Sequence, residues 1–201
     1  MLTVTRPAAS HDLTTLAAVK TAMEVTGTDD DAFLAHLITR ASDTIRAWCN
    51  RVFSVETVRE TLRLDRYRPE LVLIRFPVVS IASVTVGGTA LDAADYEADS
   101  THGVLYRLVA RGKFMCWPSD VVVVEYSAGY VLPGNDDRTL PHDIEAAALA
   151  LVRSSYHIRD RDPSLKSVTL GSTAINYQSG AETMPPDVAL ILSAHRQPAV
   201  G

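Results

Sequence analysis

Ionisable side chains that could carry out chemistry are spread along the chain rather than gathered into a recognisable site. No two histidines stand at the spacing of a metal-ligand pair, and the cysteines do not form a C-x-x-C motif. The chain also lacks G-x-S-x-G, P-loop and G-x-G-x-x-G motifs. We therefore expect no catalytic residue, no metal site and no cofactor. The side chains considered are His11, His36, His102, His142, His157, His195, Cys49 and Cys116.

Two short stretches nevertheless place potential catalytic or metal-binding groups close together. His142 precedes Asp143, but adjacent residues on a helix do not face each other, so we interpret the pair as the polar first turn of a helix. Asp160 and Asp162 lie in the alternating stretch RDRDP. An oxygen-ligand metal site needs several converging groups, so we interpret this stretch as the solvated end of a helix.

The composition is that of an ordinary globular protein, with 201 residues, a formal net charge of −5 and 47% hydrophobic residues. This acidic balance disfavours a protein that wraps DNA through its phosphates, because such a protein needs a basic face. The longest apolar run, Ala146 to Val152, is too short to span a bilayer, which takes about 20 residues, so we expect no membrane partner. The N-terminus lacks a signal-peptide pattern, and the two separated cysteines favour a cytoplasmic folding site with reduced thiols.

Apolar residues recur at helical spacing in the N-terminal part of the chain. A short helix is expected over Leu13 to Met23, and a long helix over Asp29 to Arg51. The long helix has an apolar stripe that is typical of packing against a protein core: Phe33, Leu34, Leu37, Ile38, Ala41, Ile45 and Trp48.

From Phe53 the apolar period changes to two, which predicts β-strands. Gly87-Gly88 and the stretch from Ser100 to Gly103 are turn signals between these strands. The valine-rich run from Val121 to Tyr126 predicts the most buried strand, and Ala128-Gly129 lets the chain turn tightly after it. We expect a small antiparallel β subdomain inserted between helices.

Helical spacing returns after Pro141, which suits the first turn of a helix. The stretch SVTLGSTAINYQSG predicts a β-hairpin turning at Gly171-Ser172, and Pro185-Pro186 leads into a short helix that is apolar nearly all round. The expected fold class is α+β: a small helical bundle with an inserted antiparallel β subdomain and a C-terminal β-hairpin plus short helix. The expected divisions are an N-terminal helical part (1–52), the β subdomain (53–130), a core helix that completes the bundle (131–162), and the C-terminal hairpin and helix (163–201).

Lys113 to Pro118 read KFMCWP and bring aromatic and basic side chains together. Such a cluster can stack on the bases of a nucleic acid. It can also be a loop or hairpin tip that docks onto a neighbouring subunit, because Trp, Phe and Met are enriched at protein interfaces. The acidity of the chain favours the contact with protein.

Seven short motifs follow one another over almost the whole chain, and their order is more specific than any single motif. They are the helix with Leu13, Leu16 and Lys20, the acidic stretch Asp29 to Asp31, Trp48-Cys49-x-Arg51, the strand entry Pro77 to Val84, Val124-x-Tyr126-x-Ala128-Gly129-Tyr130, Leu140-Pro141-x-Asp143-Ile144, and Pro185-Pro186-x-Val188. This order resembles the phage head–tail connector (adaptor) family, whose members form a ring beneath the portal of a tailed phage.

The resemblance implies a mechanical role in the virion and no enzymatic activity. It implies a virion structural protein of the neck, made in the host cytoplasm, that joins head to tail and extends the DNA channel. Its partners would be further copies of itself in a dodecameric ring, the portal protein, and stopper or tail proteins. Packaged DNA would pass through the lumen without specific binding.

The resemblance also implies which segments make contacts. Members of the family use the C-terminal segment to dock onto the portal, which implies a portal contact by Pro185, Pro186, Val188, Ile191, Leu192 and Arg196. A second contact, with a neighbouring subunit or the next ring, is expected at Phe114, Met115 and Trp117.

Three other classes of protein compete with this interpretation. A stopper or tail-completion protein is commonly smaller and dominated by β-structure, whereas this chain predicts a long helix from Asp29 to Arg51. A small hydrolase is disfavoured by the absent motifs. A DNA-binding regulator is disfavoured by the net charge of −5 and the lack of a basic recognition helix.

Overall fold

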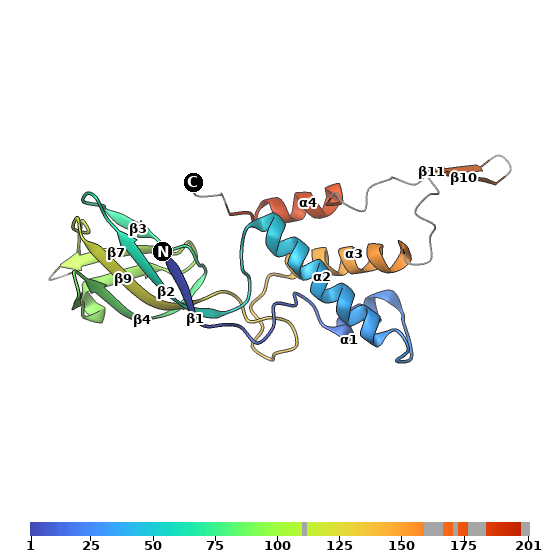
Figure 1. Cartoon of the computed structure of the whole chain (residues 1–201), viewed down its shortest axis with the longest axis horizontal. Helices are drawn as coiled ribbons and strands as arrows, with labels where there is room; N and C mark the ends of the chain where they lie inside the picture. Colours follow the sequence, from blue (N-terminus) through green and yellow to red (C-terminus); the bar gives the residue numbers. More distant parts are fainter. Residues whose placement is uncertain (110–111, 159–166, 171–172, 177–183, 198–201) are drawn as a thin grey trace. The chain divides into compact units, whose positions relative to one another are not determined.

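The structure is a computed structural model that describes residues 1–109, 112–158, 167–170, 173–176 and 184–197 (Figure 1). The chain divides into two compact units. The β unit comprises Met1–His11 and Val52–Thr139, and the helical unit comprises Asp12–Arg51 and Leu140–Gly201. Helices and antiparallel sheets are both present, so the predicted α+β fold class is confirmed.

The larger sheet of the β unit has five antiparallel strands in the order β1-β2-β9-β4-β5. The valine-rich run forms β9 at its centre, where alternate side chains are buried. Its inward-facing Val122, Val124 and Tyr126 are fully buried, which explains why a central strand is so apolar. The strands are β1 (Leu2–Arg6), β2 (Glu56–Arg63), β4 (Val78–Val86), β5 (Thr89–Ala90) and β9 (Val121–Ala128).

The smaller sheet has β7 at its centre, between β6 on one side and both β3 and β8 on the other. A single 3-10 turn, η1, leads into β6. The core of the β unit takes side chains from both sheets, so the two sheets pack face to face. The elements are β3 (Glu70–Val72), η1 (Ala93–Asp95), β6 (Tyr96–Asp99), β7 (Val104–Val109) and β8 (Lys113–Met115).

Gly129 closes the β unit directly after β9. Its φ of 123° lies in a region that L side chains rarely adopt, and a Cβ there would overlap the backbone of Ser54. The Gly129 N–H donates to the Pro77 carbonyl at 2.8 Å, and the Tyr130 N–H donates to the Phe53 carbonyl at 2.6 Å. The Ala-Gly-Tyr motif therefore joins the end of β9 to the segments that precede β2 and β4.

The helical unit contains α1 (Leu16–Met23), α2 (Asp31–Cys49), α3 (His142–Ile158) and α4 (Pro186–Ser193). Leu34, Leu37, Ile38 and Ala41 of the predicted α2 stripe are buried and pack with Val19 of α1 and Val152 of α3. Ile45 of the stripe is also buried, whereas Trp48 is partly exposed. The predicted hairpin forms β10 (Ser167–Leu170) and β11 (Thr173–Asn176), which pair antiparallel. Its predicted turn, Gly171-Ser172, lies outside the described residues. No helix in the described part of the chain is long and apolar enough to cross a membrane.

The N-terminal residues differ from the expected helical part over 1–52. Met1–His11 belongs to the β unit, because β1 pairs with β2 and the Met1 carbonyl accepts from the Thr61 N–H at 2.8 Å. The first helix begins at Leu16 rather than Leu13. The Thr15 side chain caps it by accepting from the Ala18 N–H, and the residues before Thr15 lie outside the helix.

Candidate interaction surfaces

Asp143 pairs with a distant histidine rather than with its neighbour His142. Nε2 of His195, which follows α4, lies 2.7 Å from Oδ2 of Asp143, and the Ile144 N–H donates to Oδ1 at 2.8 Å. Partial burial raises the pKa of Asp143, but the hydrogen bonds from His195 and Ile144 outweigh it and leave the pKa below its ordinary value of 3.8. The pair joins the start of α3 to the end of α4, which is a structural role.

The other candidate for a metal site, Asp160 with Asp162, lies outside the described residues. Among the residues that the structure describes, no three His, Cys, Asp or Glu side chains come together where they could hold a metal ion.

A buried polar cluster lies inside the β unit. The Tyr126 hydroxyl donates to Oε2 of Glu60 at 2.6 Å and accepts from the Arg75 N–H at 3.2 Å. The Ile74 N–H donates to the same Glu60 oxygen at 3.1 Å. Burial, and then the adjacent Glu60 carboxylate, raise the pKa of Tyr126. The cluster holds residues 74–75 against β2 and β9.

The cluster continues to a second buried carboxylate on β2, Glu56. Its Oε2 lies 3.9 Å from Nη2 of Arg75, and its Oε1 lies 3.9 Å from Nε2 of His11. Nδ1 of His11 is in turn 2.6 Å from the Ser54 hydroxyl. This arrangement connects the segment after β1 to the start of β2, so these ionisable groups serve the fold of the β unit.

The residues expected to contact the portal do not share one environment. Val188 and Leu192 are buried in the helical unit, where α4 packs on α2 and α3. Pro186 and Arg196 are exposed, and Ile191 is 38% exposed. Pro185 is partly buried and precedes the first turn. Two of the expected contact residues, Val188 and Leu192, are thus used for packing inside the helical unit.

Leu190, which was not among the expected contacts, is the most exposed apolar residue of α4. It is 76% exposed and lies one residue before Ile191, on the side of α4 opposite Val188 and Leu192. The Arg196 guanidinium is 5.4 Å from the ring centroid of Trp48, which places this cation over an aromatic ring of α2.

The three anchors expected in KFMCWP also separate. Trp117 is fully buried in the core of the β unit, and its indole N–H donates to the Leu105 carbonyl at 3.1 Å. Phe114 is 67% exposed on β8 and packs edge-on against Tyr106, with ring centroids 5.3 Å apart. Met115 is only 37% exposed and pairs with Arg107, on the other side of β8.

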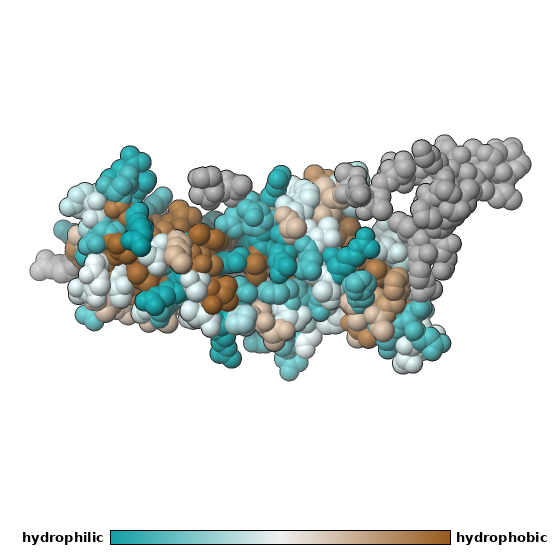
Figure 2. Space-filling view, in the orientation of Figure 1, coloured by the Kyte–Doolittle hydropathy of each residue, from teal (hydrophilic) through white to brown (hydrophobic). Residues whose placement is uncertain are grey.

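The registers of the smaller sheet identify an apolar surface around Phe114. Leu71 and Leu105 face one another and are buried, so their neighbours along β3 and β7 point outward. Phe114 lies opposite Leu108 and therefore on this outward face. We call these five outward-facing side chains the outer patch: Val72, Val104, Tyr106, Leu108 and Phe114. Figure 2 shows hydrophobic surface exposed over the β unit on the face drawn there.

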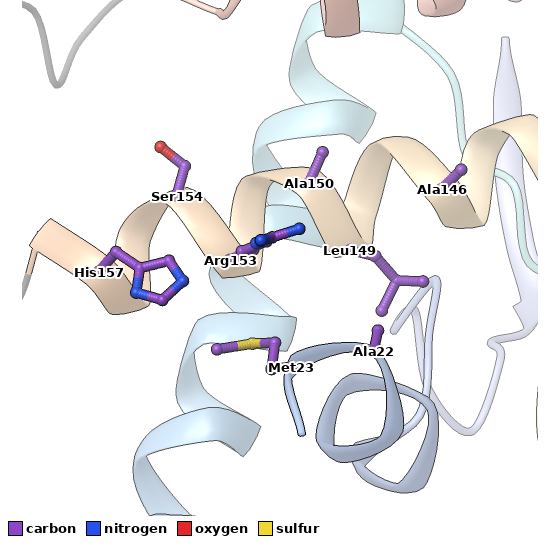
Figure 3. A pocket seen from close by; sticks show the side chains of 8 residues that line it. All are labelled: Ala22, Met23, Ala146, Leu149, Ala150, Arg153, Ser154 and His157. Carbon is purple, nitrogen blue, oxygen red and sulfur yellow. The ribbon is translucent and has the colours of Figure 1, made fainter. Parts of the chain in front are cut away.

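A second apolar surface is a groove between α1 and α3, with a volume of about 540 Å³. Ala22 and Met23 contribute from the end of α1, and Leu149 and small residues contribute from α3 (Figure 3). Arg153 and His157 lie toward the C-terminal end of α3 in the same view. We call this surface the α1–α3 groove. Its α3 side chains are Ala146, Leu149, Ala150, Arg153, Ser154 and His157.

The sequence contains a signal for the α3 side of the α1–α3 groove. Its α3 residues recur at helical spacing in the same way as the inward stripe of that helix, but on the adjoining face. In the described part of the chain, the candidate interaction sites are thus three apolar surfaces: the outer patch, the α1–α3 groove and the exposed side of α4. Exposed apolar surfaces of this kind are typical of sites that contact other proteins.

Comparison with known proteins gives the family. A profile of the head completion protein family matches residues 12–198. The chain therefore belongs to the head completion protein family, and the head–tail connector role predicted from the sequence is confirmed. Comparison with curated proteins gave no match.

Solved structures of the same fold come from gene transfer agent (GTA) particles. A chain from the neck of an empty GTA particle, with C6 symmetry, matches with a TM-score of 0.61 and 19% identity. A chain from the virion of a native GTA particle matches with a TM-score of 0.61 and 18% identity. A chain from the neck of a native GTA particle, with C12 symmetry, matches with a TM-score of 0.60 and 17% identity. Each match covers 100% of this chain and 97% of the other. At these identities the likeness establishes a shared fold.

Proposed function

We infer that the protein is one subunit of an oligomeric ring in the virion neck, where it joins the head to the tail. The observation that carries this conclusion is the match to the head completion protein family over residues 12–198. The shared fold with chains from GTA necks, one of them with C12 symmetry, supports a ring of identical subunits and favours twelve of them.

The role is mechanical and requires no covalent chemistry. The buried ionisable groups Glu56, Glu60 and Tyr126 contribute to the fold of the β unit, and the exposed apolar surfaces provide contacts between proteins. A chain with a net charge of −5, repeated around a ring, gives an assembly that repels phosphate, which suits a channel through which DNA passes without binding.

The exposed side of α4 is the proposed contact with the portal protein. It presents Leu190 and Ile191, with Pro186 at the N-terminal end of the helix and Arg196 after its C-terminal end. The buried side of α4 fixes this face on the helical unit through Val188 and Leu192, so the exposed residues are held in place before a partner arrives.

The portal contact is best tested with a surface substitution. Deletion from Met184 onward also removes Val188 and Leu192 from the core, so it changes folding and binding together. Leu190→Glu alters only the exposed side and is expected to weaken binding to purified portal rings by roughly tenfold or more. Val79→Glu, at a 60% exposed valine of β4, is the matched control. Equal portal binding by both variants would contradict the proposed contact.

The function itself is tested by removing the protein from particle assembly. Without it, we expect heads and tails to accumulate separately in the producing cell, because no subunit links them. Electron microscopy of lysates distinguishes joined from separate structures, and supplying the gene in trans restores joining. Normal joined particles in its absence would refute the role.

A further inference from the structure

We propose that the outer patch of one copy binds the α1–α3 groove of the next copy. This inference rests on the proposed ring, since it names the surfaces that neighbouring subunits use. The two surfaces belong to different units of the chain, and every copy carries both. A contact between two different surfaces repeats from copy to copy, and it closes into a ring when the rotation permits.

Phe114 supplies the projecting part of the outer patch. It is 67% exposed, yet it is not free to swing, because its ring packs edge-on on Tyr106 of the adjacent strand. Val72 of β3 is 62% exposed and lies opposite Val104, diagonally across from Tyr106 of β7. A rigid aromatic side chain that is held in place loses little conformational entropy when it binds, which is typical of residues that dominate interfaces.

The α1–α3 groove has the shape and chemistry to receive such a side chain. Small residues, Ala22, Ala146 and Ala150, leave space between the two helices. Met23 and Leu149 line the groove with flexible aliphatic and thioether surface, and methionine sulfur makes favourable contacts with aromatic rings. A groove of about 540 Å³ accommodates an aromatic side chain together with part of its surroundings.

The charges beside the two surfaces are opposite. Glu70 and Glu97 lie on either side of Tyr106 on the outward face of the smaller sheet, and neither forms an ion pair with a described residue. The positive charge beside the groove is that of Arg153, which likewise has no ion-pair partner in the described ranges. Opposite charges around an apolar contact orient the partners and exclude incorrect ones.

Two other concave regions of the described chain fit Phe114 less well. One lies along α2 and is lined mainly by polar and charged side chains, among them His36, Arg40 and Asp43. Another lies at the end of β1 and is lined partly by Arg6, Thr57 and Ser127. The α1–α3 groove combines aliphatic walls with positive charge, which are the two features that the outer patch requires.

Crosslinking between two differently marked chains tests the contact directly. One full-length chain carries Val72→Cys, beside Phe114 on the outer patch, so that the Phe114 side chain is kept. The other chain carries Ala150→Cys, and both carry Cys116→Ser so that the remaining native thiol is the buried Cys49. The chains are mixed, assembled on portal rings and treated with a short bifunctional maleimide. Because each chain has one introduced thiol, a product joining the two kinds of chain is intermolecular.

We expect this product from Val72→Cys with Ala150→Cys. We expect none from two matched pairs, Val79→Cys with Ala150→Cys and Val72→Cys with Thr39→Cys. Rings seen by electron microscopy without the expected product would overturn the contact and leave the ring function intact. Crosslinking of Val72→Cys to the portal instead would also overturn it. Absence of rings from the unmodified protein as well would overturn the proposed function and this inference together.

Substitutions provide a second readout that does not depend on crosslinking. Phe114→Ala and Arg153→Glu are each expected to weaken subunit association by roughly tenfold or more, measured by the protein concentration needed to fill portal rings. Val79→Ala and Arg40→Glu are the matched controls, since they remove an exposed apolar side chain and reverse an exposed charge elsewhere. Unchanged association of both test variants, with folding intact by circular dichroism, would contradict the contact.

Discussion

Trp117 and Phe114 come from the same short aromatic stretch, yet their surroundings are opposite. Trp117 is enclosed in the core of the β unit, whereas Phe114 is exposed on the outward face of β8. Residue type alone could not separate them, because both are common at interfaces. The register of β8 on β7, which the sequence does not reveal, points Phe114 outward. Trp117 lies beyond β8, where it forms an antiparallel bridge with Arg68.

Substitution of these two aromatics should therefore affect different properties. Trp117→Ala is expected to lower the free energy of unfolding by about 3–5 kcal/mol, because it leaves a large cavity in the core. Phe114→Ala is expected to change it by less than about 1 kcal/mol, as for most surface substitutions. Urea unfolding followed by circular dichroism measures both. A similar loss for the two variants would contradict the assignment of Phe114 to the surface.

The two cysteines should differ sharply in reactivity. Burial raises the pKa of Cys49 to about 11, although Arg51 and Arg196 lower it in part. Cys116 is exposed. At neutral pH a maleimide is expected to label Cys116 alone in the native protein and both thiols after denaturation, as read by mass spectrometry. Rapid native labelling of Cys49 would show that its surroundings, which include the Leu192 carbonyl 4.0 Å from Sγ, are open.

The Tyr126 hydroxyl is expected to stabilise the β unit through the buried Glu60 carboxylate. Tyr126→Phe removes the donor at 2.6 Å and leaves that carboxylate with one hydrogen bond fewer. We expect a loss of about 1–3 kcal/mol in the free energy of unfolding, measured by urea titration. Tyr67→Phe, at an exposed tyrosine, serves as the control. Equal stability of the two variants would show that the buried hydrogen bond contributes nothing.

At the scale of elements, α4 is held by polar contacts as well as by its apolar side. His195 joins it to Asp143 at the start of α3, and the Gln197 N–H donates to the Cys49 carbonyl at 2.8 Å. The sequence shows a helix that is apolar nearly all round, but it does not show which of its side chains are buried within the chain. Burial of Val188 and Leu192 depends on packing against α2 and α3, which are distant in sequence.

The Asp143–His195 pair predicts a pH dependence. A carboxyl group whose pKa is lower in the folded state contributes stability that is present above its ordinary pKa of 3.8 and is lost as the pH falls through the lower folded-state value. We expect wild type to lose stability more steeply than Asp143→Asn below pH 3.8, measured by urea unfolding at a series of pH values. If stability fell with pH equally in wild type and Asp143→Asn, the Asp143 carboxylate would not contribute to the pH dependence of stability.

Most helices and the strands of the inserted β segment could be predicted because their apolar spacing is regular. β1 was missed, since five mostly exposed residues give too little alternation to distinguish a strand from an irregular terminus. The sequence does not single out Glu56 and Glu60, two carboxylates of β2 that face inward. Their burial is possible only because Tyr126 and the Ile74–Arg75 segment supply partners from elsewhere in the fold.

At the scale of the whole molecule, the order of motifs along the chain identified the head–tail connector role, and the family match confirmed it. The contact surfaces could be predicted only in part. The spacing of Ala146, Leu149 and Ala150 contains the signal for one side of the α1–α3 groove, but α1 supplies the other side through tertiary packing. The outer patch joins β3, β7 and β8, so it exists only once the smaller sheet has formed.

The most direct test of the central claim is electron microscopy of the purified full-length protein mixed with portal rings from the same particle. A subunit of the neck is expected to add a collar of regularly repeated density to one end of the portal, and class averages give its symmetry. The protein alone provides no such test, because ring formation can require the portal as a template. The account predicts a ring of identical subunits coaxial with the portal channel. Portal rings that remain bare at saturating protein concentration would contradict it.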